Sequence, residues 1–233
     1  MTAQTIRGAQ RRVPLTRERV LQTAIHRADQ GGLESLSMRK LGQALGVEAM
    51  SLYRHVANRD EILDGIVEEV IGEIELPAKG ANWRLAMRRR AISAHEVILR
   101  HPWASTLIES RVLLSPAMLR YSDAIIGSLR EGGFPIAFTY RALFILDSYV
   151  YGFALQEVSW PVPAAEVAES TARLRAQVPA DLYPNVAEMM SFVADPENQF
   201  ARPSGDAGPG YSSEFEFGLD LILDGLERLR GAG

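Results

Sequence analysis

Residues 37–56, SMRKLGQALGVEAMSLYRHV, constrain the fold more than any other part of the sequence. Apolar residues recur there at helical spacing on both sides of Gly46, and Ser37 is a suitable N-cap for the first helix. Gly42 is small enough to let the second helix approach closely. The residues expected to face inward are Leu41, Leu45, Val47 and Leu52. The stretch therefore predicts two short helices joined by a tight turn.

The rest of the chain has the same helical character. Because no strand-like alternation persists, we expect an all-α protein. It divides into a disordered basic arm over residues 1–15, a three-helix unit over 16–60 and a larger helical domain over 61–233. The Pro- and Gly-rich residues 195–211 predict a mobile surface loop. The expected helices cover residues 17–31, 38–45, 48–55, about 59–76, 82–101, 102–112, 116–133, 136–159 and 212–230, with one or two more within 164–193.

Composition excludes several classes of protein. The chain has no cysteine, so disulfides and thiolate metal sites are excluded, which fits a cytoplasmic protein. The most apolar run, residues 136–155, is interrupted by Arg141 and Asp147, each of which costs about 2.5–3.5 kcal/mol at a bilayer centre. We therefore expect a buried helix and no membrane partner.

Charge is distributed unevenly along the chain. Residues 1–60 carry ten Lys and Arg against five Asp and Glu, a net charge of +5, whereas residues 61–233 carry fifteen against twenty-four, a net charge of -9. The N-terminal quarter is thus suited to a polyanion, although a local excess of charge can also be only a solvated surface.

Two short helices around a tight turn, preceded by a third helix, form a helix-turn-helix, whose second helix can enter the DNA major groove. Ala49, Met50 and Tyr53 are expected on the outer face of that helix. Ser51, Arg54 and His55 are expected beside them, and Arg39 could bind guanine through two hydrogen bonds. Arg54 has the alternative of only covering the surface. These residue types are typical of contacts to phosphates and bases.

Residues 16–66 resemble the DNA-binding domain of the tetracycline-repressor (TetR) family. The resemblance includes its Leu-Tyr-x-His-Val recognition helix and the basic residue after Asn58. The resemblance extends to Asn82-Trp83, Gly152 and residues 215–227. It implies DNA contacts, carried over to Arg39, Ser51, Tyr53, His55 and Arg59, with Lys40 as a plausible neighbour. Ala49 and Met50 replace a glutamine and a proline of the tetracycline repressors, which predicts a different operator sequence.

A single helix-turn-helix reads too few bases for a unique genomic site, so we expect a homodimer on half-sites about 34–36 Å apart. The last helix carries an apolar stripe with two small residues seven positions apart. The predicted interface residues are Phe215, Gly218, Leu219, Ile222, Gly225, Leu226 and Leu229. The alternative is that these residues form only a core within one chain.

The family resemblance also implies a small-molecule effector pocket in the larger domain. Two patterns place polar groups on apolar helix faces: Tyr140, Phe144, Asp147 and Tyr151 share one face, and His95 lies between apolar neighbours on another. Weaker candidates for the pocket are Trp103, Leu107, Arg111 and Tyr121. A buried His or Asp that bonds only to its own core is the alternative.

Tetracycline repressors hold their drug as a magnesium chelate through histidines of the fourth and sixth helices. The corresponding segments here, GEIELP and PWASTLIESRV, contain no histidine. We therefore expect no metal and no cofactor. The predicted effector is an apolar or aromatic compound with a polar group.

These patterns favour a ligand-responsive dimeric transcriptional repressor that binds a palindromic DNA operator and is released by a small-molecule effector. The alternative is a DNA-binding regulator or architectural protein without an effector. An enzyme using His95 with Glu96, Asp147 or Glu109 is a third class, but no phosphate-binding loop, ordered triad or set of metal ligands supports a reaction. We therefore predict that the protein is not an enzyme.

Overall fold

The computed structural model describes residues 14–111, 115–160, 166–195 and 211–230. Its longer elements there are α-helices, and no strand occurs among these residues, so the all-α prediction is confirmed. Nearly all of the predicted basic arm and of the predicted loop over residues 195–211 lies outside the described residues. No helix in the described part is long and apolar enough to cross a membrane.

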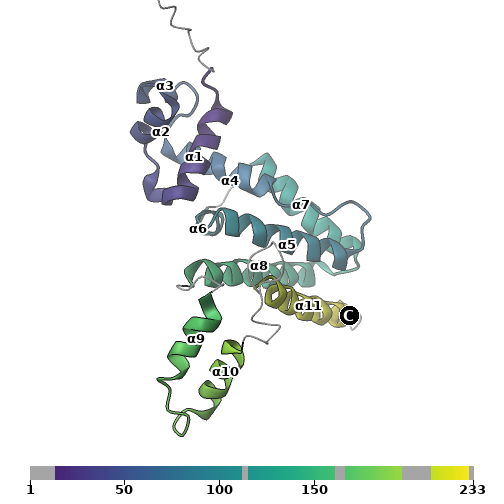
Figure 1. The fold of residues 1–233 in the computed structure, drawn as a ribbon. Helices are drawn as coiled ribbons and strands as arrows, with labels where there is room; N and C mark the ends of the chain where they lie inside the picture. The colour runs from purple at the N-terminus through teal and green to yellow at the C-terminus, as the bar shows by residue number, and fades with distance from the viewer. Residues whose placement is uncertain (1–13, 112–114, 161–165, 196–210, 231–233) are drawn as a thin grey trace, which may run out of the picture.

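The N-terminal unit consists of short helices. These are α1 (Arg17–Gly31), the 3-10 turn η1 (Leu33–Ser35), α2 (Met38–Leu45) and α3 (Ala49–Leu52), followed by the connecting helix α4 (Arg59–Gly72). Figure 1 shows α1–α3 as a lobe at one end of the molecule, from which α4 leads into the larger body. The helix α4 packs against α1 on one side and against α6 and α7 on the other.

The body is formed by longer helices. These are α5 (Trp83–Arg100), α6 (Ala104–Ser110), α7 (Pro116–Glu131), α8 (Ile136–Ser159), α9 (Val167–Arg175), α10 (Pro184–Ala194) and α11 (Tyr211–Arg230). The helix α5 packs against α7, α8 and α11, while α8 also packs against α7 and α11. A hairpin of α9 and α10 extends away from this layered body (Figure 1).

Side-chain caps mark four of the helix starts. Thr16, Ser37, Asn58 and Asn82 each precede a helix and accept a hydrogen bond from the backbone N–H three residues later, at 3.2, 3.3, 2.8 and 3.1 Å. Each bond satisfies one of the donors that a helix N-terminus leaves without a partner. The alternative cap of the fourth helix, Asp60, lies in the first turn of α4.

Glycines shape the turn between α2 and α3. Gly46 ends α2 in the left-handed conformation, with φ of 70°. A Cβ atom on Gly42 would lie 2.8 Å from the carbonyl oxygen of Val47, so only glycine fits at this close approach. The turn therefore sets the position of α3 through backbone contact.

Several helices are shorter than expected; α6 spans Ala104–Ser110 instead of 102–112, and α7 ends at Glu131 instead of 133. The helix α3 ends at Leu52, and the chain continues as a turn in which the His55 N–H donates to the Leu52 carbonyl at 2.8 Å. The helix α4 ends at Gly72 instead of near Leu76. Helical spacing continues beyond both ends, which explains why the sequence pattern overestimated their lengths.

Candidate nucleic-acid interface and effector-domain cluster

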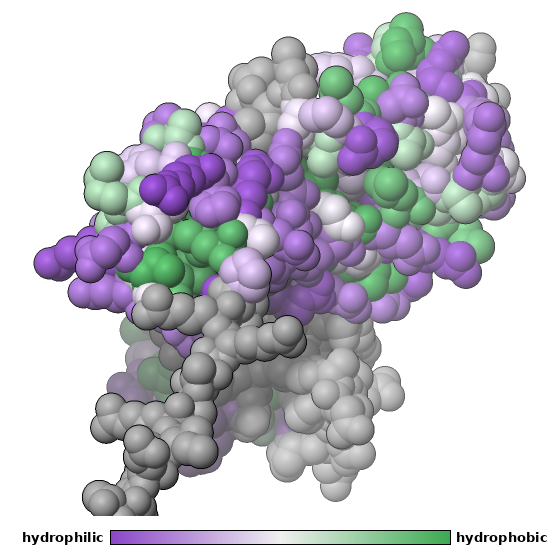
Figure 2. Space-filling view, turned by 90° about the horizontal axis from the view of Figure 1, so that it is seen from above, coloured by the Kyte–Doolittle hydropathy of each residue, from purple (hydrophilic) through white to green (hydrophobic). Residues whose placement is uncertain are grey.

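The outer face of α3 presents side chains to solvent. Met50 and Tyr53 are 75% and 46% exposed, whereas Leu52 between them is fully buried and anchors the helix. Arg39 and Arg54 are exposed, and Lys40, Ala49, Ser51 and His55 are half-buried. Seen from above these N-terminal helices, the surface is mostly hydrophilic with smaller hydrophobic patches (Figure 2). The residues predicted from sequence are thus accessible on one lobe.

Arg59, for which a DNA contact is predicted, also stabilises the fold. Its Nε donates to the carbonyl oxygen of Leu36 at 3.3 Å, and its Nη2 donates to that of Leu33 at 3.2 Å. These bonds hold the turn before α2 against the start of α4. Beside it, the Ala57 N–H donates to the Glu61 carboxylate at 2.6 Å, which reinforces the Asn58 cap.

Three residues predicted for the effector pocket lie instead in the core or where the body meets the N-terminal lobe. The Trp103 indole N–H donates to Asp29 of α1 at 2.7 Å, and Leu107 is buried in the core. Arg111 forms ion pairs with Asp60, at 3.0 Å, and with Asp64, both on α4. Burial alone would lower the pKa of Arg111, but these two carboxylates raise it. Trp103 and Arg111 therefore tie α1 and α4 to the α6 region.

A histidine outside the predictions strengthens the same junction. His101 bonds through Nδ1 to Asp29 at 2.8 Å, and its Nε2 lies 3.4 Å from Glu73 at the end of α4. The sequence signal was weak, because a lone histidine before a proline does not show which distant carboxylates it meets.

His95 is buried, as predicted, but its polar partner is internal. The imidazole stacks on Phe215, with ring centroids 4.0 Å apart, and hydrogen-bonds to Glu157 of α8. Glu157 also lines a hollow of about 480 Å³, together with Phe153, Gln156 and Trp160 among others. His95 therefore orients a carboxylate and connects α5, α8 and α11.

The strongest polar cluster of the body forms around a residue that the sequence analysis missed, Arg90 of α5. Its guanidinium lies 2.6 Å from the Asp147 carboxylate, and its Nε donates to the Tyr121 hydroxyl at 2.8 Å. Burial alone would lower the pKa of Arg90, but Tyr121, Asp147 and Tyr151 raise it, so the group stays charged. Arg90 stands three residues after buried Met87 and four before buried Ala94, a spacing that could have placed it on the buried face.

The four residues of α8 that were predicted for the effector pocket lie in two different environments. Asp147 and Tyr151 belong to the Arg90 cluster, but Tyr140 and Phe144 are 71% and 67% exposed on the surface of the subunit. The shared helical face was identified correctly, but it spans the boundary between the interior and the surface. Tyr140 and Phe144 therefore do not line an enclosed pocket within this subunit.

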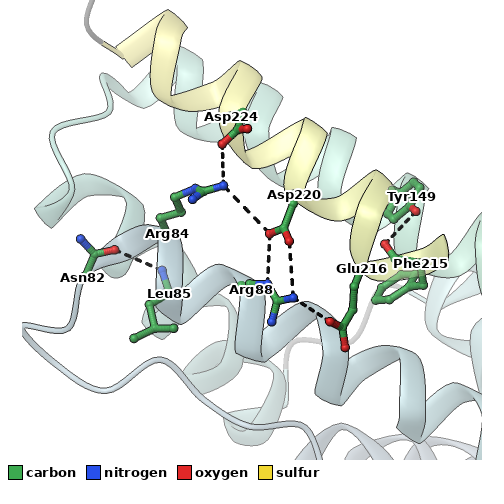
Figure 3. Close-up of polar contacts among 9 residues, drawn as sticks. All are labelled: Asn82, Arg84, Leu85, Arg88, Tyr149, Phe215, Glu216, Asp220 and Asp224. Carbon is green, nitrogen blue, oxygen red and sulfur yellow. Dashed lines mark hydrogen bonds and ion pairs between the residues drawn. The ribbon is translucent and has the colours of Figure 1, made fainter. Parts of the chain in front are cut away.

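The predicted interface stripe on α11 is mostly turned inward. Phe215, Leu219 and Leu226 are buried within the subunit, and Ile222 is partly buried against the core. A Cβ atom on Gly218 would collide with the Tyr149 hydroxyl, which donates to the Phe215 carbonyl at 2.9 Å (Figure 3). For these residues, the alternative of a core within one chain is the better description.

The exposed apolar face of α11 carries two residues of the predicted stripe, Gly225 and Leu229, and two residues beside it. Phe217, Leu221 and Leu229 are exposed, and a Cβ atom on Gly225 would have open space around it. On the side facing α5, Arg84 and Arg88 form ion pairs with Glu216, Asp220 and Asp224 (Figure 3). This ladder fixes which face of α11 lies against the body and which remains open.

An exposed short helix after a tight turn, on a lobe joined to a larger helical body, defines the class of helix-turn-helix transcriptional regulators. Residues 76–230 match the family described as "Tetracyclin repressor-like, C-terminal domain". The chain belongs to the TetR family of transcriptional regulators.

Individual relatives match most of the chain. The HTH-type transcriptional repressor DrrR1 of Streptomyces coeruleorubidus is 32% identical over 225 residues, which are 92% of this chain and 78% of that protein. The tetracycline repressor class C of Escherichia coli is 27% identical over 93% of this chain and 92% of its own length. The structure of ActR from Streptomyces coelicolor in complex with actinorhodin has a TM-score of 0.70 and 31% identity, covering 95% of this chain and all of that chain.

Proposed function

We propose that the protein is a dimeric transcriptional repressor whose α3 helices bind successive major grooves of a palindromic operator and whose DNA affinity falls when a small molecule binds the body. The observation that carries the proposal is the exposure of Met50 on α3 and of Tyr53 directly after it, while Leu52 is buried behind them. An exposed aromatic and an exposed methionine on a rigid lobe suit base and phosphate contact.

DNA contacts are assigned to both sides of the turn. Tyr53, His55 and Ser51 supply donors to phosphates, and Arg39 reads a guanine edge. Lys40 and Arg54 add positive charge, while Ala49 and Met50 offer apolar contact to thymine methyl groups. Arg59 acts mainly by holding the turn before α2, as its two backbone bonds require.

Dimerisation uses the open faces of α8 and α11. Tyr140 and Phe144 on α8, with Phe217 and Leu221 on α11, form exposed apolar surface that a second copy would cover. Phe215 and Leu219 face the interior of the subunit. The proposed interface therefore lies about half a helical turn around α11 from the stripe predicted by sequence.

Effector response requires a route from the body to the lobe. The Arg111 ion pairs to Asp60 and Asp64, and the Trp103 bond to Asp29, join α6 and its preceding turn to α4 and α1. A ligand that displaces α6 would change the angle of the lobe. A coupling free energy of roughly 1–3 kcal/mol is sufficient for a five- to 150-fold change in DNA affinity. The relative solved with actinorhodin supports a small-molecule effector.

DNase footprinting on the DNA upstream of the protein's own gene tests this function. We expect a protected palindrome and about tenfold or greater loss of affinity when Tyr53→Ala is combined with His55→Ala, since two phosphate contacts are removed. Glu96→Ala, at an exposed position of α5, serves as the control and should leave the footprint unchanged. Equal binding by the double variant and the parent protein would refute the assigned DNA face.

A further inference from the structure

The carboxylate of Glu157 on α8 is held in place by one of its two oxygen atoms. Its side chain is 10% exposed, and the His95 Nε2 hydrogen-bonds to Glu157 Oε2. The His95 ring is itself fixed, since it is buried and stacks on Phe215. Among the described residues, Glu157 Oε1 has no bonding partner, and no Lys or Arg pairs with this carboxylate. A nearly buried acceptor oxygen therefore lacks a donor within the subunit.

Open space adjoins this carboxylate. Glu157 lines the hollow of about 480 Å³ together with Phe153, Gln156, Ser159 and Trp160. The chain has a few fully buried side-chain atoms without a bonding partner, and Glu157 Oε1 is not among them. Because Oε1 has no partner, it must retain accessible surface. A molecule in the hollow can therefore reach it.

The other walls of the hollow also favour positive charge. Phe153 and Trp160 supply aromatic rings, of which Trp160 is 55% exposed, and the faces of such rings attract cations. Gln156 and Ser159 belong to the last turn of α8, where backbone carbonyl oxygens create a partial negative charge. No basic side chain stands in that turn to balance it. The carboxylate, the helix end and the rings thus favour the same kind of ligand.

The negative charge of Glu157 is also felt by a neighbouring group. Burial raises the pKa of the Tyr149 hydroxyl, and the charge of Glu157 raises it further. An anionic ligand in the hollow would meet the same repulsion, whereas a cation would relieve it. The site therefore discriminates by charge as well as by shape.

We propose that the hollow at the C-terminal end of α8 is the effector site of this chain and that it takes a ring compound carrying a protonated aliphatic amine. The ammonium group donates to Glu157 Oε1, and the ring packs against Trp160. This inference rests on the proposed ligand response and names the class of ligand and the residue that selects it.

The site is connected to the DNA-binding lobe through α5. His95, which holds Glu157, lies on α5, and the same helix ends at His101. His101 bonds through Nδ1 to Asp29 of α1 at 2.8 Å. A ligand that changes the Glu157–His95 contact therefore acts on the helix whose end touches the lobe.

Three probes with the same indole-ethyl body separate the possible ligand classes: tryptamine, tryptophol and indole-3-propionate, which are a cation, a neutral alcohol and an anion at pH 7. Calorimetry on the full-length protein without DNA measures their dissociation constants. We expect tryptamine to bind about tenfold more tightly than tryptophol, since a charge-assisted hydrogen bond replaces a neutral one, and indole-3-propionate to bind most weakly. Equal affinity for tryptamine and tryptophol, or no binding of tryptamine, would overturn the proposal.

A variant at the carboxylate locates the selecting group. Glu157→Gln keeps the shape of the side chain and removes its charge, so the preference for tryptamine over tryptophol should disappear. Glu96→Gln makes the same change at an exposed position of α5 and should keep the preference. A preference that survives in Glu157→Gln would refute the role of Glu157.

A gain of binding provides a test that does not depend on the folding of Glu157→Gln. Gln156 is exposed and lines the hollow, so Gln156→Glu should strengthen tryptamine binding about three- to fivefold, as an exposed ion pair allows, and weaken binding of indole-3-propionate. Gln177→Glu is the matched control, at an exposed position between α9 and α10, and should change neither. Equal effects of the two variants would show general charge attraction and contradict the proposed site.

All of these measurements omit DNA. They are therefore independent of the footprinting result, which tests operator binding alone.

Discussion

The N-terminal lobe and the body differ in whether they bury polar side chains. Among the described residues, the buried side chains of the lobe, from Val20 to Val56, are all apolar. The buried polar side chains all lie in the body: Arg90, His95, His101, Ser128 and Thr139. Apolar side chains pack without directional bonds, whereas each buried polar group needs a partner in the right position. The comparison indicates that apolar packing holds the lobe together, whereas the body also depends on matched polar contacts.

The largest effect is expected where the lobe is most tightly packed. Leu52→Ala removes a fully buried side chain and should lower the free energy of unfolding by about 4 kcal/mol, with loss of DNA binding. Urea denaturation measures the change. Met50→Ala, two residues away and exposed, is the control and should stay within about 0.5 kcal/mol. Similar losses in both variants would contradict the burial pattern of α3.

A smaller effect should follow from breaking a charge pair in the body. Asp147→Leu leaves Arg90 without its carboxylate and should cost about 2–3 kcal/mol, below the range for a fully buried pair because Asp147 is partly exposed. Asp224→Leu removes the exposed partner of Arg84 and should cost less than about 1 kcal/mol. Chemical denaturation of both variants tests the difference, which would vanish if the Arg90 cluster were solvated.

The smallest effect concerns pH. Burial, the main cause, raises the pKa of the Tyr121 hydroxyl above its ordinary value of 10.0, against the opposing influence of Arg90. The unfolded chain therefore loses this proton first, so stability should fall as pH rises above about 10. Tyr121→Phe should flatten the fall without removing it, since the pKa of Tyr149 is also raised by burial. Denaturation midpoints between pH 8 and pH 11 measure the slope, and an unchanged slope would argue against Tyr121 as its source.

The same contrast explains what could be predicted from sequence. In the lobe, the caps Thr16 and Ser37 and the glycines Gly42 and Gly46 act through local backbone geometry, which a single chain segment reveals. Helical spacing and the family resemblance were therefore sufficient to predict the fold and the exposed face of α3.

In the body, the candidate site is formed by contacts between segments that lie far apart in the sequence. The helix α8 is apolar around much of its circumference, so spacing alone did not show that Tyr140 and Phe144 face outward while Asp147 reaches Arg90. The same ambiguity on α11 placed Phe215 at the surface. Arg90 was missed because three consecutive arginines suggest a solvated face, and only its burial beside Tyr121 distinguishes it.

The contact of Gly42 with the Val47 carbonyl has a consequence for how such a repressor could acquire new targets. Main-chain atoms of Val47 and Ala49 lie against Gly42, and the exposed Met50 side chain takes no part in this contact. The side chains at positions 49 and 50, to which we assign base contacts, can therefore be exchanged while this main-chain contact stays the same.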